Sequence, residues 1–197
     1  RVGDIRSKAG NVELTAPQSI IDANPADLLG DAGLDPADVS GVNITLHALG
    51  GSIGTEENFL ETDLLDTVGG VAQSGVLKAD AELSAYLTET QGNLRVFLVE
   101  SKTGDVVLTT RAGSILDANG GTEANAGGRV LDAPNVKAFN VDLDANGGSI
   151  GHVEDDFDID SSTSDAGPVA GGRLYAEADG SLYLTETSRH LDVLAAK

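Results

Sequence analysis

The chain contains no cysteine, methionine or tryptophan. Without cysteine it forms neither a disulfide framework nor a thiolate metal site. The lack of easily oxidised residues fits an exposed, secreted protein. No stretch reaches the ~18 consecutive apolar residues of a membrane-spanning helix, so we expect no membrane insertion. Aromatic residues make up only 4% of the chain, which is sparse for a platform that stacks sugars or bases.

Basic residues are also scarce, because 12 Lys and Arg stand against 32 Asp and Glu and give a net charge of −20. A surface of this charge repels nucleic acid phosphates and anionic membranes, so neither is an expected partner. The acidic excess is spread over both halves of the chain rather than gathered in a tail. It indicates a well-solvated surface, of the kind found in salty or calcium-containing water.

The most informative feature is a repeat that spans the whole chain. Phrases from the first half return 94 to 97 residues later, which divides the chain into unit one, residues 1–103, and unit two, residues 104–197. Residues 5–10 also resemble residues 99–104, so we interpret the chain as a fragment of a longer array. The clearest pairs are Gly10–Thr15 with Gly104–Thr109, Ser19–Asn24 with Ser114–Asn119, Gly50–Gly54 with Gly147–Gly151, and Tyr86–Thr90 with Tyr183–Thr187.

Short segments alternate apolar and polar residues, which is the period of a β-strand. Val12–Thr15, Val42–Leu46 and Leu94–Glu100 are examples, and the clusters of Gly, Asn and Asp between such segments predict turns. The best helical pattern, Glu56–Val68, has an Asp-rich and Ser-rich counterpart in unit two, so we interpret it as a strand and a loop. The chain is therefore predicted to be all-β.

The spacing of these strands admits a tandem of β-sandwich domains, a β-barrel or a β-solenoid such as a right-handed parallel β-helix. Sandwich domains would need a linker near Ser101–Gly104, but only a tight turn separates the apolar segments there. Shorter phrases that recur within each unit are better explained as successive coils of a solenoid, so the β-helix is the predicted fold. In this register Leu87 and Leu184, from the repeated phrase Tyr-Leu-Thr-Glu-Thr, point inward, whereas Thr88 and Thr185 point outward.

One phrase points to a family. Gly104–Ile115 reads Gly-Asp-Val-Val-Leu-Thr-Thr-Arg-Ala-Gly-Ser-Ile, and Gly10–Ile20 is a looser version with Gln18 in place of the second glycine. These phrases resemble the repeats of the filamentous-haemagglutinin-like exoproteins, a group of large bacterial adhesins. The resemblance implies an extracellular or cell-surface location, a β-helical shaft and a role in attachment or biofilm formation. The partners it implies are further repeats of the same chain and a surface or glycan ligand of unknown identity.

Part of unit two resembles a calcium-binding loop. Asp142, Asp144 and Asn146 follow the spacing of the first half of such a loop, whose alternate oxygens and central glycine wrap the ion. The closing glutamate is expected at Val153, however, and Glu154 comes one residue late. Unit one has no copy of the pattern. An alternative is that Asp142 and Asp144 form the solvent face of a strand whose apolar residues point inward.

A dense acidic run follows directly, and its carboxylates would repel one another unless water or a cation lies between them. Calcium is therefore the one cofactor that the sequence suggests, held by the two acidic segments of unit two. The run comprises Glu154, Asp155, Asp156, Asp158 and Asp160.

Enzymatic interpretations are weaker. Gly50–Gly54 and Gly147–Gly151 both match Gly-x-Ser-x-Gly, the nucleophile elbow of the α/β-hydrolases, but a working elbow needs a following helix and a correctly placed histidine. We interpret both phrases as tight corners of a solenoid. The remaining alternative is a β-helical polysaccharide lyase or hydrolase with paired carboxylates, although the basic residues that would clamp acidic sugars are spread singly. We expect no enzymatic activity.

Overall fold

The computed structural model describes residues 1–24, 36–120, 133–162, 172–188 and 190–197. In these residues every regular element is a β-strand, which confirms the all-β prediction. The segment Glu56–Val68 is a loop followed by short strands, as interpreted above. The described part of the chain has no helix long and apolar enough to cross a membrane.

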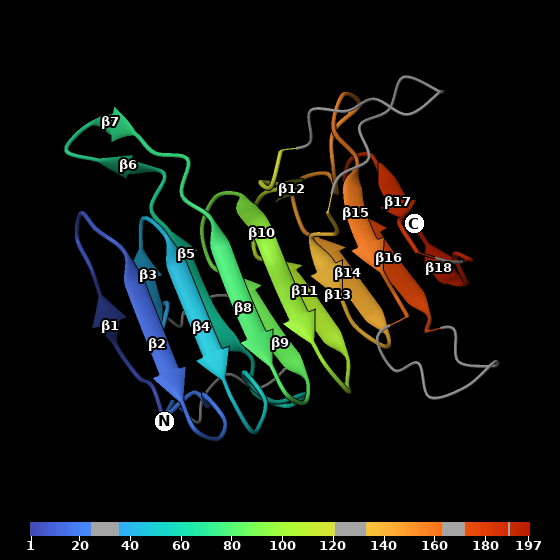
Figure 1. Ribbon diagram of the computed structural model, residues 1–197. Helices are drawn as coiled ribbons and strands as arrows, with labels where there is room; N and C mark the ends of the chain where they lie inside the picture. The colour runs from blue at the N-terminus through green and yellow to red at the C-terminus, as the bar shows by residue number, and fades with distance from the viewer. Residues whose placement is uncertain (25–35, 121–132, 163–171, 189) are drawn as a thin grey trace.

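Two eight-stranded sheets hold sixteen of the eighteen strands, and all their strand pairs are parallel (Figure 1). The first sheet contains, in spatial order, β1 (Ile5–Arg6), β3 (Val39–Gly41), β5 (Leu60–Leu64), β9 (Ala85–Glu89), β11 (Val106–Thr110), β14 (Val141–Ala145), β16 (Leu174–Ala178) and β18 (Val193–Ala196). The second contains β17 (Leu184–Glu186), β15 (Phe157–Asp160), β13 (Val136–Lys137), β10 (Leu94–Ser101), β8 (Leu77–Ala81), β4 (Ile44–Ala48) and β2 (Val12–Ala16), with β12 (Ile115–Asp117) also paired to β10. β6 (Thr67–Val68) and β7 (Val71–Ala72) form a separate antiparallel hairpin.

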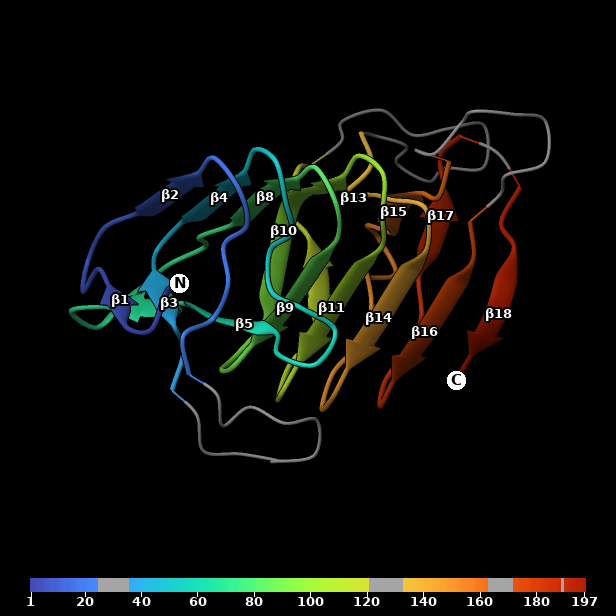
Figure 2. The same cartoon turned by 90° about the horizontal axis from the view of Figure 1, so that it is seen from below.

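Apart from the β6–β7 hairpin, successive strands of the chain alternate between the two sheets, except that β12 and β13 both lie in the second. β8 in the second sheet, for example, is followed by β9 in the first, β10 in the second and β11 in the first. The sheets lie face to face, and their strands stack side by side from the N-terminal to the C-terminal end (Figures 1 and 2). Both sheets cross the boundary between the units, since β9 pairs with β11 and β10 with β13. This arrangement is consistent with a β-helix and differs from the antiparallel sheets of sandwich domains.

Inward side chains stack in rows, one residue from each strand. Leu60, Leu87, Leu108 and Leu143 are successive partners across β5, β9, β11 and β14, and all four are fully buried. Neighbouring strands lie ~4.8 Å apart, so equivalent aliphatic side chains touch along each row. Burying each of these leucines contributes roughly 1.5–3 kcal/mol. The core is therefore one continuous apolar stack between the two sheets.

The predicted register holds for the inward leucines and fails in part for the threonines. Leu87 is buried, and Leu184 on β17 packs against the core while remaining partly exposed. Thr88 takes the outward position but is only 7% exposed. Its strand lies between β5 and β11, and the Arg111 side chain, which begins just beyond β11, reaches across to Glu61 on β5. The outer face is thus covered at Thr88, whereas Thr185 is half-buried.

The sequence repeat relates strands of opposite sheets. β4 lies in the second sheet and its repeat counterpart β14 in the first, while β8 and β16 are related in the same way. Seven steps from sheet to sheet separate β4 from β14, by way of β5, β8, β9, β10, β11 and β13. Because seven is odd, each copy arrives on the other sheet. The outer face of one sheet in unit one therefore corresponds to the outer face of the other sheet in unit two.

The two Gly-x-Ser-x-Gly phrases form corners between strands. The hydroxyl oxygens of Ser52 and Ser149 accept the backbone N–H groups of Ser84 and Ser181, at 3.3 and 3.0 Å. The glycine that closes each phrase has a positive φ, 65° and 70°, which a residue with a β-carbon rarely adopts. The serines therefore join neighbouring corners.

Candidate functional site

The first three residues predicted to bind calcium are spread along one strand and its corner. Asp142 and Asp144 lie on the outer face of β14, while Val141 and Leu143 of the same strand are buried in the core. Asn146 lies in the following corner, where its side-chain amide donates to a backbone carbonyl at 3.0 Å. These positions agree with the alternative interpretation of the sequence, in which Asp142 and Asp144 form the solvent face of a strand.

The acidic run is divided between a loop and a strand. Glu154 and Asp155 lie in the loop before β15, and Asp156 accepts a hydrogen bond from the Thr185 hydroxyl at 2.8 Å. Asp158 and Asp160 belong to β15, and Asp158 is fully buried. None of the eight predicted residues belongs to a cluster of three convergent carboxylates in the described part of the chain.

Such a cluster forms in unit one instead, from Asp22, Asp38 and Glu61. Asp22 follows Ile20, which pairs with Ile53, and Asp38 immediately precedes β3. The parallel pairing of β3 with β5 then places Asp38 beside Glu61, whose backbone N–H donates to Asp38 Oδ2 at 3.4 Å. Each of the three offers a carboxylate oxygen, and these oxygens lie within 4.8 Å of one another. We call these three residues the acidic triad.

The triad is almost completely buried, since Asp22, Asp38 and Glu61 are 1%, 2% and 3% exposed. Burial, together with the neighbouring Asp22, raises the pKa of Asp38 to about 7. Burial and the Asp38 carboxyl raise the pKa of Glu61 to about 8, against the opposing effect of Arg111. The Arg111 guanidinium Nη2 lies 3.3 Å from Glu61 Oε1. The arrangement therefore resists the simultaneous ionisation of all three carboxyl groups.

Hydrogen bonds fix the orientation of Asp22. Its Oδ1 accepts the backbone N–H of Asn24 at 2.8 Å, and its Oδ2 accepts the side-chain amide of Asn58 at 2.9 Å. Glu61 Oε2, by contrast, is buried and has no hydrogen-bond donor among the described residues. A buried carboxylate oxygen without a donor is costly, so the triad has an unmet demand for positive charge or a proton.

Unit two contains a similar constellation with two changes, an asparagine in place of Asp38 and an aspartate in place of Glu61. Asp117, Asn135 and Asp158 occupy the repeat positions of Asp22, Asp38 and Glu61. The Asn119 N–H donates to Asp117 Oδ1 at 2.7 Å, and the Asp158 N–H donates to Asn135 Oδ1 at 2.9 Å. The amide of Asn135 additionally donates to Asp117 Oδ1 at 2.7 Å. An amide thus bridges the position where two carboxyl groups meet in unit one.

A second candidate lies on the outer face of the first sheet, where a groove of about 460 Å³ runs across several strands. Tyr86, Val107, Asp142 and Tyr175 are successive register partners along it. Phe59 lies against Tyr86, with ring centroids 5.6 Å apart. Although aromatic residues are few, three of them gather here. Other residues of this outer groove are Glu56, Asp105, Val106, Asn140, Val141, Arg173 and Leu194.

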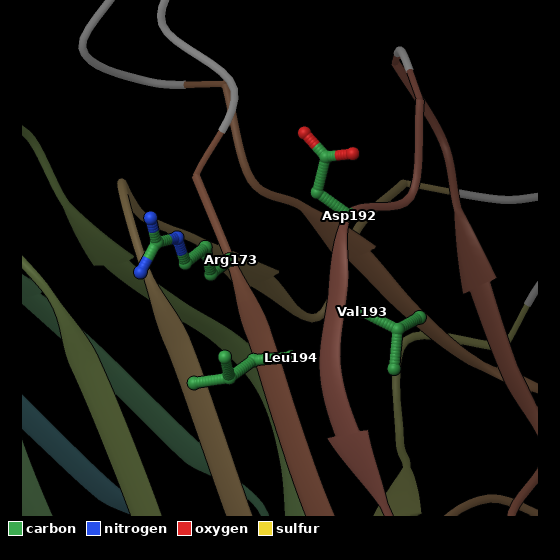
Figure 3. Close-up of a pocket in the computed structure, with 4 residues that line it drawn as sticks. All are labelled: Arg173, Asp192, Val193 and Leu194. Atoms are coloured by element: carbon green, nitrogen blue, oxygen red, sulfur yellow. The ribbon is translucent and has the colours of Figure 1, made fainter.

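The C-terminal end of the groove adjoins an apolar edge. Val193 and Leu194 point to opposite sides of β18, and with Arg173 and Asp192 they line a smaller hollow of about 290 Å³ (Figure 3). Leu194 is 64% exposed and Val193 is 50% exposed. Val193 is in register with Leu174, which is buried in the core. The exposure of Val193 therefore marks the place where the stacked core meets solvent.

Comparison of the chain with family models, with characterised proteins and with solved structures finds no match. The features of the chain that bear on its function are therefore the fold, the acidic triad and the outer groove.

Sequence reasoning missed the triad because its members come from three separate segments. A signal was nevertheless present, since Asp22 and Asp117 hold the same place in the repeated phrase Ser-Ile-x-Asp-Ala-Asn. An aspartate retained in both units, just after an inward isoleucine, marks a specific role in the coil. No sequence signal marked the outer groove, because the register between neighbouring strands brings its residues together.

Proposed function

We propose that the chain is a segment of a right-handed parallel β-helix that serves as a shaft in a secreted or surface-exposed repeat adhesin. The observation that carries this proposal is that the chain passes back and forth between two parallel sheets around one core. In such an arrangement each added pair of strands lengthens the molecule without widening it. This is the property required of a protein that holds a binding surface away from a cell.

The exposed end of the core supports further repeats of the same chain as partners. Among the described strands β18 pairs with β16 alone, and its inward Val193 is half exposed. An edge of unpaired N–H and C=O groups beside apolar side chains is a template for another strand. A following coil with the same register would bury Val193 and complete the hydrogen bonding of β18.

The outer groove is the place where we propose that the shaft contacts its surface or glycan ligand. Tyr86 and Tyr175 offer ring faces, and Asp142, Asn140 and Arg173 offer donors and acceptors between and beside them. Sugars are commonly bound by this combination of flat apolar faces and polar groups. The role is binding rather than turnover, and the polysaccharide lyase or hydrolase remains the alternative to be tested.

Small-angle X-ray scattering of the chain and of a tandem duplicate tests the shaft. Eight strands at ~4.8 Å spacing extend over roughly 34 Å, so duplication is expected to add at least this length while the cross-section stays unchanged. Two lobes joined by a hinge, or a doubled cross-section, would contradict the proposal.

A panel of neutral and acidic glycans tests the groove. Binding that is lost in Tyr175→Ala and kept in Thr15→Ala, on the outer face of the second sheet, is the expected result. Release of reducing ends or unsaturated sugars in the same panel would instead establish the enzymatic alternative.

A further inference from the structure

The acidic triad has a charge imbalance that the described residues do not resolve. Three carboxylates and the Arg111 guanidinium leave two negative charges in a region that is almost fully buried. Charges removed from water must be paired, or the groups must take up protons. Glu61 Oε2 shows the imbalance directly, because it is buried without a hydrogen-bond donor. One divalent cation would neutralise the cluster and give this oxygen a partner.

We propose that Asp22, Asp38 and Glu61 bind one divalent cation through their carboxylate oxygens, and that Ca²⁺ is the ion that fits best. This site is distinct from the calcium segments predicted in unit two, and it does not depend on the proposed shaft or ligand. All three ligands are hard oxygen donors, which excludes a preference for soft metals.

The geometry is compatible with calcium. Ca²⁺ holds oxygen ligands at 2.3–2.6 Å, so two ligands on opposite sides of the ion lie ~5 Å apart. The three carboxylate oxygens already lie within 4.8 Å of one another. Three carboxylates supply up to six oxygens, and the hydrogen bonds that hold Asp22 leave its further lone pairs available. Mg²⁺ would need a tighter octahedron at 2.0–2.1 Å and usually keeps several waters, for which a buried site has less room.

Unit two supplies an internal comparison on the same backbone. There Asn135 replaces the carboxyl group of Asp38, keeps the bond from the following strand, and donates its amide to Asp117. The contact between residues 117 and 135 is thereby satisfied without an ion. In unit one both partners of the equivalent contact, Asp22 and Asp38, are acceptors when ionised. Unit one therefore lacks the amide donor that joins these two positions in unit two, and a cation between the two carboxylates would take its place.

The experiment treats the whole chain with a chelator, removes the chelator, and then titrates calcium into the chain in an isothermal titration calorimeter. Measurement at about pH 8 and ~0.15 M salt favours ionised carboxylates and screens weak binding to the exposed acidic surface. The expected result is saturable binding of one Ca²⁺ per chain, release of protons, and a higher Tm with calcium than in chelator.

The matched variant is Asp38→Asn, which copies the chemistry of unit two and is expected to fold. It should lower calcium affinity by roughly 100-fold or more, because affinity depends on the number of charged ligands. Glu61→Gln is a second variant of the same kind, and circular dichroism verifies the fold of each. Glu13→Gln, which removes an exposed outer-face carboxylate of β2, is the control and should bind as the parent chain does.

Two outcomes would overturn the site. One is the absence of saturable binding and of any Tm difference between calcium and chelator, which would mean that the triad holds only protons. The other is calcium affinity that is unchanged in folded Asp38→Asn and Glu61→Gln. Magnesium titrated in the same way distinguishes the ions, since a site that prefers Mg²⁺ would contradict the assignment to calcium.

Discussion

Truncation of two leucines from the same repeated phrase separates burial from local sequence. Leu87 and Leu184 both stand in Tyr-Leu-Thr-Glu-Thr. Leu87 is fully buried and is flanked in register by Leu60 and Leu108, which are also fully buried. Parallel hydrogen bonds hold the neighbouring strands at fixed spacing, so a cavity at Leu87 has little means of collapsing. Leu87→Ala should therefore cost about 4 kcal/mol, toward the upper end of the ~2–5 kcal/mol found for buried leucines.

Leu184→Ala should cost much less, about 1–2 kcal/mol. Among the described strands its strand, β17, pairs with β15 alone, and the Leu184 side chain is partly exposed beside Phe157. Less area returns to water and the surrounding groups can relax. Urea unfolding followed by far-UV circular dichroism gives both free energies of unfolding. Equal losses for the two variants, or a larger loss for Leu184→Ala, would refute the assignment of Leu87 to the continuous core.

The remaining predictions concern a corner and the pH dependence of stability. Gly75→Ala should strongly lower Tm, because a β-carbon there would overlap the carbonyl oxygen of Val42, whereas Gly3→Ala, with its nearest heavy atom at 3.8 Å, should change Tm little. In chelator, the free energy of unfolding should fall as pH rises from about 5 to about 9. The pKa values of Asp38, Glu61 and Glu89, about 7, about 8 and about 8, mean that the native state keeps protons that the unfolded chain has released. Urea unfolding across this pH range measures the effect, and calcium should reverse the part of the loss that comes from Asp38 and Glu61; stability that rises with pH in chelator would contradict the prediction.

Much of the coil could be predicted from the sequence, because the inward residues obey a period of two. The alternation in Val42–Leu46 predicts buried Ile44 and Leu46, and both are fully buried. The serine and glycine phrases likewise predict corners, since only a turn uses that composition. These features depend on neighbours within a few residues, and short-range patterns record them.

The candidate sites depend on register between strands, which short-range patterns do not record. The calcium prediction for unit two followed the local density of carboxylates within single segments, and it stays a prediction. In a parallel stack the nearest side-chain neighbours come from the strands above and below, as Asp38 and Glu61 show. A site built in this way has no characteristic spacing in the sequence.

The odd number of strand steps in the repeat has a consequence for how the two acidic constellations act. Asp38 and Glu61 lie just before β3 and in β5 of the first sheet, whereas Asn135 and Asp158 lie just before β13 and in β15 of the second, so the repeat places one buried constellation at each sheet. Only unit one has a carboxyl group at the middle position. A cation bound there would tie the segment containing Asp22 to β3 and β5, and its removal would weaken those coils first. Unit two connects Asp117 to Asn135 through the Asn135 amide, so this connection should not depend on calcium.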